Sequence, residues 1–513
     1  LIDLFKLPCY IYSYYTGLLR FELYNNREVS MKKAVNWKDS KWKTRMRITL
    51  DYKNMMADSV GKNYGITLSE MEKMSATAKR IDKDLKQGWR ERRIGFFDLP
   101  FQGENVDKIK SFSRKVKSGY DSFVVLGIGG SALGPIALQT ALNPPHYNLL
   151  TKKERNGSPK LFVADNIDPT GFEGILRVLD PEKTMFNVIS KSGGTAETMS
   201  QFIIVRDLLK KRLGKSYKNH IVATTDPEKG ILRKIATDEG FETFPIPANV
   251  GGRFSIFSSV GLLPAAVVGI DIEELLAGAA YMNELCMTSD LFQNPAYLNA
   301  TLQYLANRKG KPMSVMMPYA DSLKDIADWY RQLWAESLGK KVSLDGKTVH
   351  VGPTPIKALG ATDQHSQLQL YMEGPLDKVI TLIRVKDFGA EAKIPKAYKE
   401  IGELGYLGGH SLKGLLQAEM LATEMALTHN QRMNCTITLP EVNAFTIGQL
   451  LQMLMIQTAF AGGLYNIDPF DQPGVEHGKQ YAYGMMGRKG YEKKRAEVDE
   501  YLKQAEGLKG YAV

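Results

Sequence analysis

Cysteine is scarce in this chain of 513 residues, and the three cysteines, Cys9, Cys286 and Cys435, are far apart in the sequence. None belongs to a Cys-x-x-Cys pair or to a Cys/His cluster, so the sequence favours neither a disulfide framework nor a structural zinc site. Such sparse use of cysteine is typical of a reducing compartment. We therefore expect a cytoplasmic protein.

The first segment, residues 1–45, lacks the features of a targeting or membrane sequence. Its aromatic run at 10–15 is too short to span a bilayer, and no basic-then-apolar signal peptide is present. The chain begins with Leu1, so Met31 or Met46 is a candidate true start, with the preceding residues either a poorly ordered extension or foreign to the protein. We expect no membrane association.

Excess positive charge is confined to one short stretch of the chain. The net charge is +11, but residues 31–47 alone carry seven basic residues against Asp39, which leaves a mildly basic body. Such a body suits a small anionic substrate, and a local basic run is more often a solvated tail than a nucleic-acid arm. We expect no nucleic-acid partner.

Two glycine-rich stretches lack the spacing of the common nucleotide motifs. Gly127, Gly129, Gly130 and Gly134 do not fit Gly-x-Gly-x-x-Gly, and no acidic residue follows to hold a ribose. The stretch 188–199 (Val-Ile-Ser-Lys-Ser-Gly-Gly-Thr-Ala-Glu-Thr-Met) has no closing Gly-Lys-Ser/Thr and is not a Walker motif. A dinucleotide-dependent dehydrogenase is therefore the weakest hypothesis.

The stretch 188–199 nevertheless has the chemistry of a phosphate cradle. An apolar strand end runs into hydroxyls, a lysine and two glycines, and residues 196–213 continue as a predicted helix. The unpaired N–H groups and the dipole at such a helix start attract a dianion. The candidate phosphate ligands are Ser190, Lys191, Ser192, Thr195 and Thr198. The alternative is a simple turn with a helix cap at Thr195.

Predicted strands and helices alternate along most of the chain, which indicates an α/β fold with doubly wound parallel sheets in αβα layers. Residues 46–97 have a helical pattern throughout. The predicted strands are 123–126, 161–164, 186–189, 220–225, 242–245, 313–318, 378–385 and 436–439. The further predicted helices are 106–118, 133–142, 169–179, 196–213, 228–239, 321–338, a helix start at 362–371, 411–429, 447–461 and 488–507.

Four motifs, in order, resemble the glucose-6-phosphate isomerase family. They are Val-Gly-Gly-Arg-Phe-Ser-Ile-Phe-Ser-Ser-Val-Gly at 250–261, Gln-Leu-Trp-Ala-Glu-Ser at 332–337, Gly-Ala-Thr-Asp-Gln-His at 360–365 and Gly-Gly-Leu-Tyr-Asn-Ile-Asp-Pro-Phe-Asp-Gln-Pro-Gly-Val-Glu-His-Gly-Lys at 462–479. The resemblance covers about 46–507. The sequence departs from the family at Ala248, usually acidic or small and polar, and at Gly193-Gly194, usually an aromatic–threonine pair.

The resemblance implies two sugar-isomerase (SIS) domains of flavodoxin-like type, flanked by helical segments. We expect an N-terminal extension at 1–45, a helical segment at 46–119, a first SIS domain with the phosphate loop at 120–285, a second at 286–440, and a C-terminal helical arm at 441–513. It also implies a homodimer in which His365 reaches the site of the other subunit.

Isomerising an aldose phosphate to a ketose phosphate requires ring opening and a proton shift between C2 and C1 through an enediol(ate). By resemblance, Glu336 is the base, Arg253 stabilises the negative oxygens, and His365 and Lys479 open the ring. Lysine and histidine can both be tuned to exchange protons near neutral pH. Further substrate contacts are implied at Gly130, Ser131, Gly252, Gln332 and Gln472, besides the phosphate ligands.

The chemistry implied by the resemblance needs neither a cofactor nor a metal, and no His/Asp/Glu cluster has ligand spacing. We expect reversible conversion of glucose 6-phosphate to fructose 6-phosphate, as in glycolysis and gluconeogenesis. Two alternatives remain open from the sequence. One is a non-catalytic phosphosugar-binding regulator, and the other is an isomerase of a different sugar phosphate such as mannose 6-phosphate.

Overall fold

The computed structural model describes residues 37–506. The chain divides into two compact units, Leu1–Arg45 and Met46–Val513. In the first unit the described part contains one helix, α2 (Ser40–Arg45). Most of the predicted extension at 1–45, including Cys9, lies outside the described residues. All other described elements belong to the second unit.

The first sheet of the second unit is parallel throughout. Its strands are β2 (Ser122–Leu126), β3 (Lys160–Ala164), β4 (Thr184–Ile189), β5 (Ile221–Thr225) and β6 (Glu242–Pro245). Their order is β3-β2-β4-β5-β6, with Val124 of β2 opposite Phe162 and Phe186. This is the flavodoxin-like order, in which the chain switches direction between the first and third strands. The predicted parallel sheet is confirmed, and the switch lies between β2 and β4.

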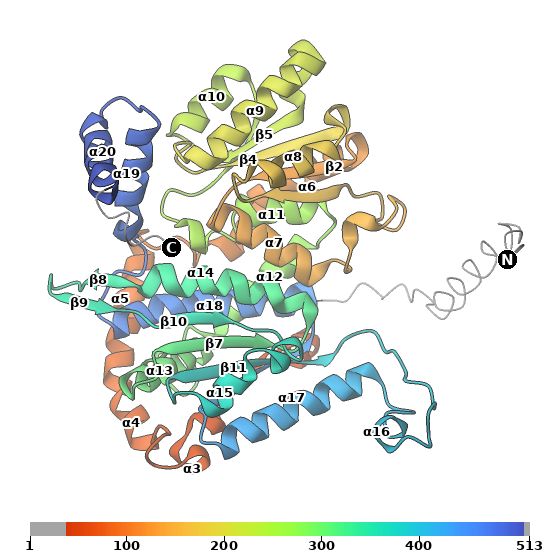
Figure 1. Ribbon diagram of the computed structural model, residues 1–513, viewed down its shortest axis with the longest axis vertical. Coiled ribbons are helices and arrows are strands. Elements are labelled where there is room, and N and C mark those ends of the chain that lie inside the picture. Colours follow the sequence, from red (N-terminus) through yellow and green to blue (C-terminus); the bar gives the residue numbers. More distant parts are fainter. Residues whose placement is uncertain (1–36, 507–513) are drawn as a thin grey trace, which may run out of the picture. The chain divides into compact units, whose positions relative to one another are not determined.

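Helices cover both faces of this sheet (Figure 1), because successive strand residues point to opposite sides. Phe123 and Val125 belong to the large central core, whereas Val124 and Leu126 pack in a separate outer core. The outer core also contains side chains from α8 (Pro169–Arg177), α9 (Ala196–Leu213) and α10 (Ile231–Glu239). The central core contains side chains from α6 (Gly103–Gly119), α7 (Gly130–Leu142) and α11 (Ser259–Val267).

The second sheet has four parallel strands and one antiparallel edge strand. The parallel strands are β7 (Met313–Pro318), β10 (Thr354–Lys357), β11 (Lys378–Asp387) and β12 (Asn434–Glu441), and the edge strand is β1 (Thr49–Asp51). The order is β1-β12-β11-β7-β10. The arrangement of β10-β7-β11-β12 repeats that of the first four strands of the other sheet. The N-terminal strand β1 occupies the position of the fifth.

The strand β1 corrects the prediction that residues 46–97 are helical throughout. Thr49 pairs with Thr438 and Asp51 with Thr436, so this segment satisfies the open edge of β12. The unpaired N–H and C=O groups along a sheet edge favour pairing with another strand. A local helical pattern does not reveal this long-range interaction. The rest of the segment contains the predicted helical structure, as α3 (Ala57–Val60), α4 (Leu68–Lys73) and α5 (Ser75–Arg90).

The second sheet is also covered on both faces (Figure 1). Its outer core contains side chains from α15 (Leu368–Glu373) and α17 (Leu412–His429). On the inner side lie α12 (Ile272–Leu285), α13 (Pro295–Arg308), α14 (Lys324–Leu338) and α18 (Ala444–Leu464). The remaining α-helices and strands of the described residues are α16 (Gly402–Gly405), the hairpin of β8 (Lys340–Val342) and β9 (Thr348–Val351), and the pair α19 (Glu476–Met485) and α20 (Glu492–Glu506).

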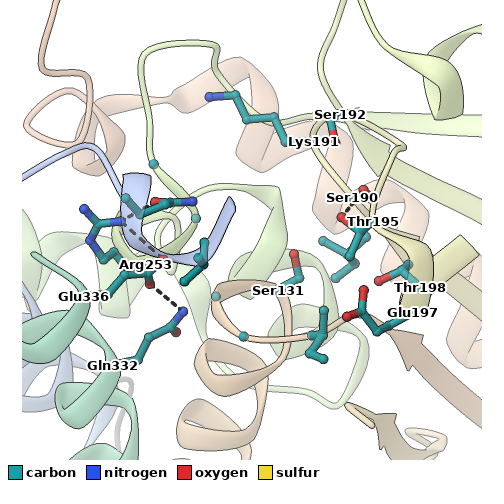
Figure 2. A pocket seen from close by; sticks show the side chains of 18 of the residues that line it. Ser131, Ser190, Lys191, Ser192, Thr195, Glu197, Thr198, Arg253, Gln332 and Glu336 are labelled. Carbon is teal, nitrogen blue, oxygen red and sulfur yellow. Dashed lines mark hydrogen bonds and ion pairs between the residues drawn. The ribbon is translucent and has the colours of Figure 1, made fainter. Parts of the chain in front are cut away.

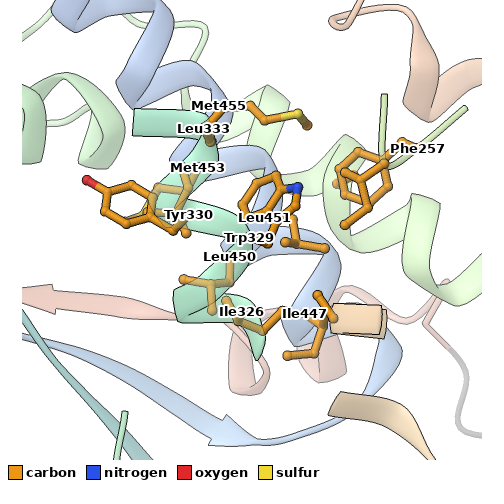
Figure 3. Close-up of a cluster of buried hydrophobic side chains, with 14 of the residues drawn as sticks. Phe257, Ile326, Trp329, Tyr330, Leu333, Ile447, Leu450, Leu451, Met453 and Met455 are labelled. Carbon is orange, nitrogen blue, oxygen red and sulfur yellow. The ribbon is translucent and has the colours of Figure 1, made fainter. Parts of the chain in front are cut away.

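The helix α18 forms the centre of the core. Within residues 37–506 it alone has the length and apolar composition of a membrane span, but the whole of its apolar window is buried inside the protein. Figure 3 shows its side chains, among them Leu450 and Leu451, beside Trp329 and Leu333 of α14. An apolar helix surrounded by protein in this way is a core helix. Its packing fixes α14, which carries Glu336, between the two sheets.

Candidate active site

Two glycine- and serine-rich turns lie where the strand order of the first sheet reverses. One follows β2 and the other follows β4, so both are at the carboxyl edge of the sheet. Ligands of doubly wound sheets bind at this point, because two neighbouring loops separate there and leave a crevice. Both turns line a single cavity of about 950 Å³, part of which is shown in Figure 2.

The turn after β2 requires glycine at two positions. Gly129 has a φ of 57°, which glycine adopts without strain. A Cβ atom on Gly130 would lie 2.3 Å from the carbonyl oxygen of Gly252 and 2.8 Å from the main-chain nitrogen of Arg253. The main chain of this turn is therefore packed against the main chain of Gly252 and Arg253. The hydroxyl-bearing residue Ser131 follows on the cavity wall.

The loop after β4 is held by its own hydroxyl groups at the start of α9. The main-chain N–H of Gly193 donates to Ser190 Oγ at 3.1 Å, and that of Gly194 donates to Ser192 Oγ at 3.1 Å. Ser190 Oγ also lies 3.1 Å from Thr195 Oγ1. The loop thus gathers hydroxyls and N–H groups beside a helix N-terminus. Such a combination is typical of phosphate sites.

One further hydroxyl in this loop region has no protein partner. Thr198 is 1% exposed, and its Oγ1 makes no hydrogen bond to any group in the part of the chain that the structure describes. The residue lies in the first turn of α9 and lines the cavity. A buried polar atom costs free energy unless it is paired. A phosphate oxygen in the cavity would supply the missing partner.

The departure from the family at Gly193-Gly194 has a local structural reason. Gly193 has a φ of 65°, and a Cβ there would lie 2.1 Å from the main-chain nitrogen of Leu232. The main-chain N–H of Ile231 donates to the carbonyl oxygen of Ser192 at 3.0 Å. The loop is therefore packed tightly against the start of α10. A side chain at 193 would force the two segments apart.

Lys191 lines the cavity but its ammonium group faces another segment. Nζ donates to the carbonyl oxygens of Ala248 at 2.5 Å and Val250 at 3.1 Å. Figure 2 shows it pointing away from Ser190 and Thr195. Burial lowers the pKa of Lys191, and Asp226 opposes that shift. In this arrangement the lysine ties the loop after β4 to the turn before Arg253, and its predicted contact with phosphate stays a prediction.

Arg253 is buried and almost fully hydrogen-bonded. Its Nε donates to Ser337 Oγ at 2.7 Å and its Nη1 to Gln472 Oε1 at 2.6 Å. Its Nη2 donates to the main-chain oxygens of Pro469 at 2.5 Å and Asp471 at 2.9 Å. Burial lowers its pKa, while nearby carboxylates oppose this shift, and a guanidinium stays protonated in proteins. The site therefore contains a fixed positive charge.

Glu336 lies beside this charge on α14. Its Oε1 is 3.6 Å from Arg253 Nη1, and its Oε2 accepts from Gln332 Nε2 at 3.0 Å. The side chain is 24% exposed and faces the cavity. Gln332 Oε1 is buried, and no group within residues 37–506 donates to it. The carboxylate is thus oriented from two sides but open to a ligand, as a base that must reach a carbon-bound proton has to be.

Lys479 and His365 have different positions relative to this cavity. Lys479 lies on α19, lines the cavity, and forms an ion pair with Glu476 at 2.8 Å. His365 lies in a short 3-10 helix at Thr362–His365, is exposed, and does not line the cavity of its own chain. The structure therefore brings all the predicted site residues except His365 to one cavity. Those residues are Gly130, Ser131, Ser190, Lys191, Ser192, Thr195, Thr198, Gly252, Arg253, Gln332, Glu336, Gln472 and Lys479.

Sequence reasoning missed several residues of this cavity and its support. Asp226 and Lys229 follow β5 at the same sheet edge. The rule that ligands bind at the carboxyl ends of parallel strands, which located the two glycine turns, applies to them as well. Glu197 lies inside the stretch already singled out. Ser337, which accepts from Arg253, follows the predicted base directly. Within the described residues no group of three or more His, Cys, Asp or Glu side chains is placed to hold a metal ion.

Comparison with known proteins gives a consistent result. A family model described as phosphoglucose isomerase matches residues 99–504. The glucose-6-phosphate isomerase of Carboxydothermus hydrogenoformans is 52% identical over 82% of this chain and 90% of that protein. The enzyme of the same name from Rubrobacter xylanophilus is 46% identical over 86% of this chain and 99% of that protein.

Solved structures extend this likeness to the fold. A hypothetical protein from Thermus thermophilus has a TM-score of 0.76 and 37% identity, with 86% of this chain and all of that chain covered. A glucose-6-phosphate isomerase from Chlamydia trachomatis has a TM-score of 0.66 and 26% identity, with 78% of this chain and 76% of that chain covered. The residues that the family model matches, 99–504, include the parallel strands of both sheets and the residues that line the cavity.

Proposed function

The chain belongs to the phosphoglucose isomerase family, and we propose that its cavity interconverts glucose 6-phosphate and fructose 6-phosphate through a cis-enediol(ate) with Glu336 as the base. The observation that carries this proposal is the pairing of Glu336 with Arg253 at 3.6 Å in a cavity that also contains the hydroxyl-rich loop. A carboxylate, a fixed cation and an anion cradle are the three groups that the enediol(ate) step needs.

Each group has a separate task in this mechanism. The loop at Ser190–Thr195 and Thr198 bind the phosphate and so fix the sugar chain relative to α14. Glu336 removes the proton from C2 of the open-chain aldose and returns it to C1. Arg253 stabilises the negative charge that develops on the C1 and C2 oxygens, and a preorganised cation is most effective there because it need not reorganise during the reaction.

The unpartnered oxygen of Gln332 supports an orienting role at the sugar hydroxyls. It can accept a hydrogen bond from substrate while its amide nitrogen holds Glu336 Oε2. Gln472 connects the same site to Arg253 from the C-terminal arm. The main chain at Gly130 and Gly252 permits close approach of the ligand. No step in this scheme requires a metal ion or an organic cofactor.

Ring opening is assigned to Lys479 of one subunit and His365 of a second. His365 is exposed and lies outside the cavity of its own chain, which supports a homodimer in which it completes the neighbouring site. Exposed apolar side chains on the outer helices support self-association, because water contact there is unfavourable. They include Leu370 (52% exposed), Leu421 (50%) and Met425 (63%).

The dimer and its shared site can be tested by complementation. Glu336→Gln and His365→Ala should each have little activity alone. If the two variants are unfolded together and refolded as a mixture, hybrid dimers retain one intact site, so about a quarter of wild-type activity should return. Equal loss in the mixture and in the separate variants would contradict the shared site.

We also place the protein in the cytoplasm, which the scattered, buried Cys286 and Cys435 support.

The activity itself is tested by following glucose 6-phosphate formed from fructose 6-phosphate with a coupled NADP⁺-dependent dehydrogenase. Removal of the base in Glu336→Gln should lower kcat by about 10²- to 10⁴-fold. Mannose 6-phosphate should be tested as an alternative product. A folded wild-type protein that binds fructose 6-phosphate but forms neither aldose would favour a non-catalytic regulator and refute the proposal.

A further inference from the structure

A buried lysine that the proposed mechanism does not use lies next to the base. Lys340 is the first residue of β8 and is 7% exposed. It is not among the residues that line the cavity. Its Nζ donates to the main-chain oxygens of Glu336 at 2.8 Å and Ser337 at 2.9 Å. Burying an ammonium group costs free energy unless its N–H groups are hydrogen-bonded. These two bonds offset part of that cost.

Both acceptors belong to the last turn of α14. The final carbonyl groups of a helix have no partner within it, and a cation there satisfies them and is favoured by the helix dipole. The two bonds of Lys340 thus tie the main chain of Glu336 and Ser337 to β8. Without them the residues around Glu336 would form a helix end that is free to fray.

The same lysine also reaches the segment that holds Arg253. Its Nζ lies 3.5 Å from Asp471 Oδ1, while the main-chain oxygen of Asp471 accepts from Arg253 Nη2 at 2.9 Å. On the other side, Arg253 Nε donates to Ser337 Oγ. Lys340 and Arg253 therefore both bridge the end of α14 and the segment at 469–472. Burial and the nearby Arg253 lower the pKa of Lys340, whereas Asp471 opposes the shift.

We propose that Lys340 is a positioning residue of the isomerase site: it fixes the Glu336 carboxylate relative to Arg253 by clamping the end of α14 to Asp471. The inference rests on the proposed function of Glu336. Misplacement of a reacting group by about 1 Å costs roughly 10²-fold in rate. Loss of the clamp should therefore affect proton transfer much more than phosphate binding, which depends on a loop of the first sheet.

The test compares Lys340→Met with Lys341→Met. Methionine keeps the length of the side chain but has neither the charge nor the three donors. The neighbouring Lys341 is exposed and is not among the residues that line the cavity, so its variant is a matched control. We expect Lys340→Met to lower kcat by about 10- to 100-fold with KM for fructose 6-phosphate and inhibition by inorganic phosphate little changed. The control should match wild type.

A second readout separates positioning from a general loss of stability. With glucose 6-phosphate deuterated at C2, a well-placed Glu336 returns part of the deuterium to C1, and the rest exchanges with water. Lys340→Met should return a smaller share than wild type at the same temperature. A partition ratio equal to that of wild type, or a kcat equal to that of Lys341→Met, would overturn the inference.

If Lys340→Met does not fold, Asp471→Asn decides the question by the same two criteria. This change removes the carboxylate that faces Lys340 but keeps the main-chain bond to Arg253. We expect a smaller fall in kcat, with deuterium return shifted in the same direction, and an unchanged partition would overturn the inference. The activity of the wild type in the same assay distinguishes the two claims. If the wild type is inactive, the proposed function of Glu336 is refuted. If it is active, the variants test the role of Lys340 alone.

Discussion

Replacement of Thr198 by valine should weaken phosphate binding without harming the unliganded protein. Valine has nearly the shape of threonine, and within residues 37–506 no group bonds to the hydroxyl that is lost. In the proposed complex that hydroxyl donates to a charged phosphate oxygen. A hydrogen bond to a charged group contributes about 1.5–3 kcal/mol. Since about 1.4 kcal/mol is tenfold, KM should rise about 10- to 150-fold.

The assay has two parts. The first is KM and kcat for fructose 6-phosphate, and the second is the rise in Tm that inorganic phosphate produces. The matched control is Thr237→Val, because this threonine of α10 is exposed and its Oγ1 donates to the carbonyl oxygen of Arg233 in its own helix. An unchanged KM and an undiminished phosphate effect on Tm in Thr198→Val would refute the assignment. A lower Tm of the unliganded variant would refute the claim that the hydroxyl has no structural partner.

Two further predictions concern stability and thiol chemistry. Gly130→Ala places a Cβ 2.3 Å from the Gly252 carbonyl oxygen and should destabilise the protein by about 1–3 kcal/mol, whereas Gly252→Ala, whose Cβ meets no atom within 4 Å, should leave Tm nearly unchanged. Burial raises the pKa of Cys286 to about 12 and of Cys435 to about 11. Neither thiol should react with iodoacetamide at pH 8 until the protein unfolds. Burial of the two neutral thiols should contribute fully to the free energy of unfolding below about pH 8. Above that pH the contribution should fall, because thiols of the unfolded chain lose their protons before those of the folded protein. Rapid labelling of either cysteine in the native protein, read by mass spectrometry, would contradict this burial.

The elements that local pattern predicted well are those whose structure follows from local chemistry. All eight predicted strands are present, because apolar runs between turns are typical of strands buried on both faces. The loop between β4 and α9 was predictable because hydroxyls, glycines and a helix start are adjacent in the sequence, and phosphate binding there stays a prediction. The Glu336 and Arg253 motifs, by contrast, were assigned by resemblance. Their separation of 3.6 Å depends on packing between α14 and the turn at Gly252, which no local pattern contains.

The features that sequence reasoning missed depend on tertiary contacts. The strand β1 forms because β12 offers a free edge, and residues 46–97 have no local sign of it. The direction of the Lys191 ammonium depends on two carbonyl oxygens about sixty residues away in sequence. In the sequence Lys340 is one of two consecutive lysines, and its burial and its bonds to the end of α14 distinguish it from Lys341. Long-range contacts of this kind cannot be predicted from local sequence patterns.

The most direct test of the proposed mechanism is proton NMR of fructose 6-phosphate with the protein in deuterium oxide, beside Glu336→Gln. The mechanism predicts glucose 6-phosphate that carries deuterium at C2, formed by the wild type and abolished in the variant, because a solvent-exchanging carboxylate removes and returns the proton. Product that forms at the wild-type rate in Glu336→Gln, or sugar that shows neither conversion nor exchange with the folded wild-type protein, would contradict the central claim.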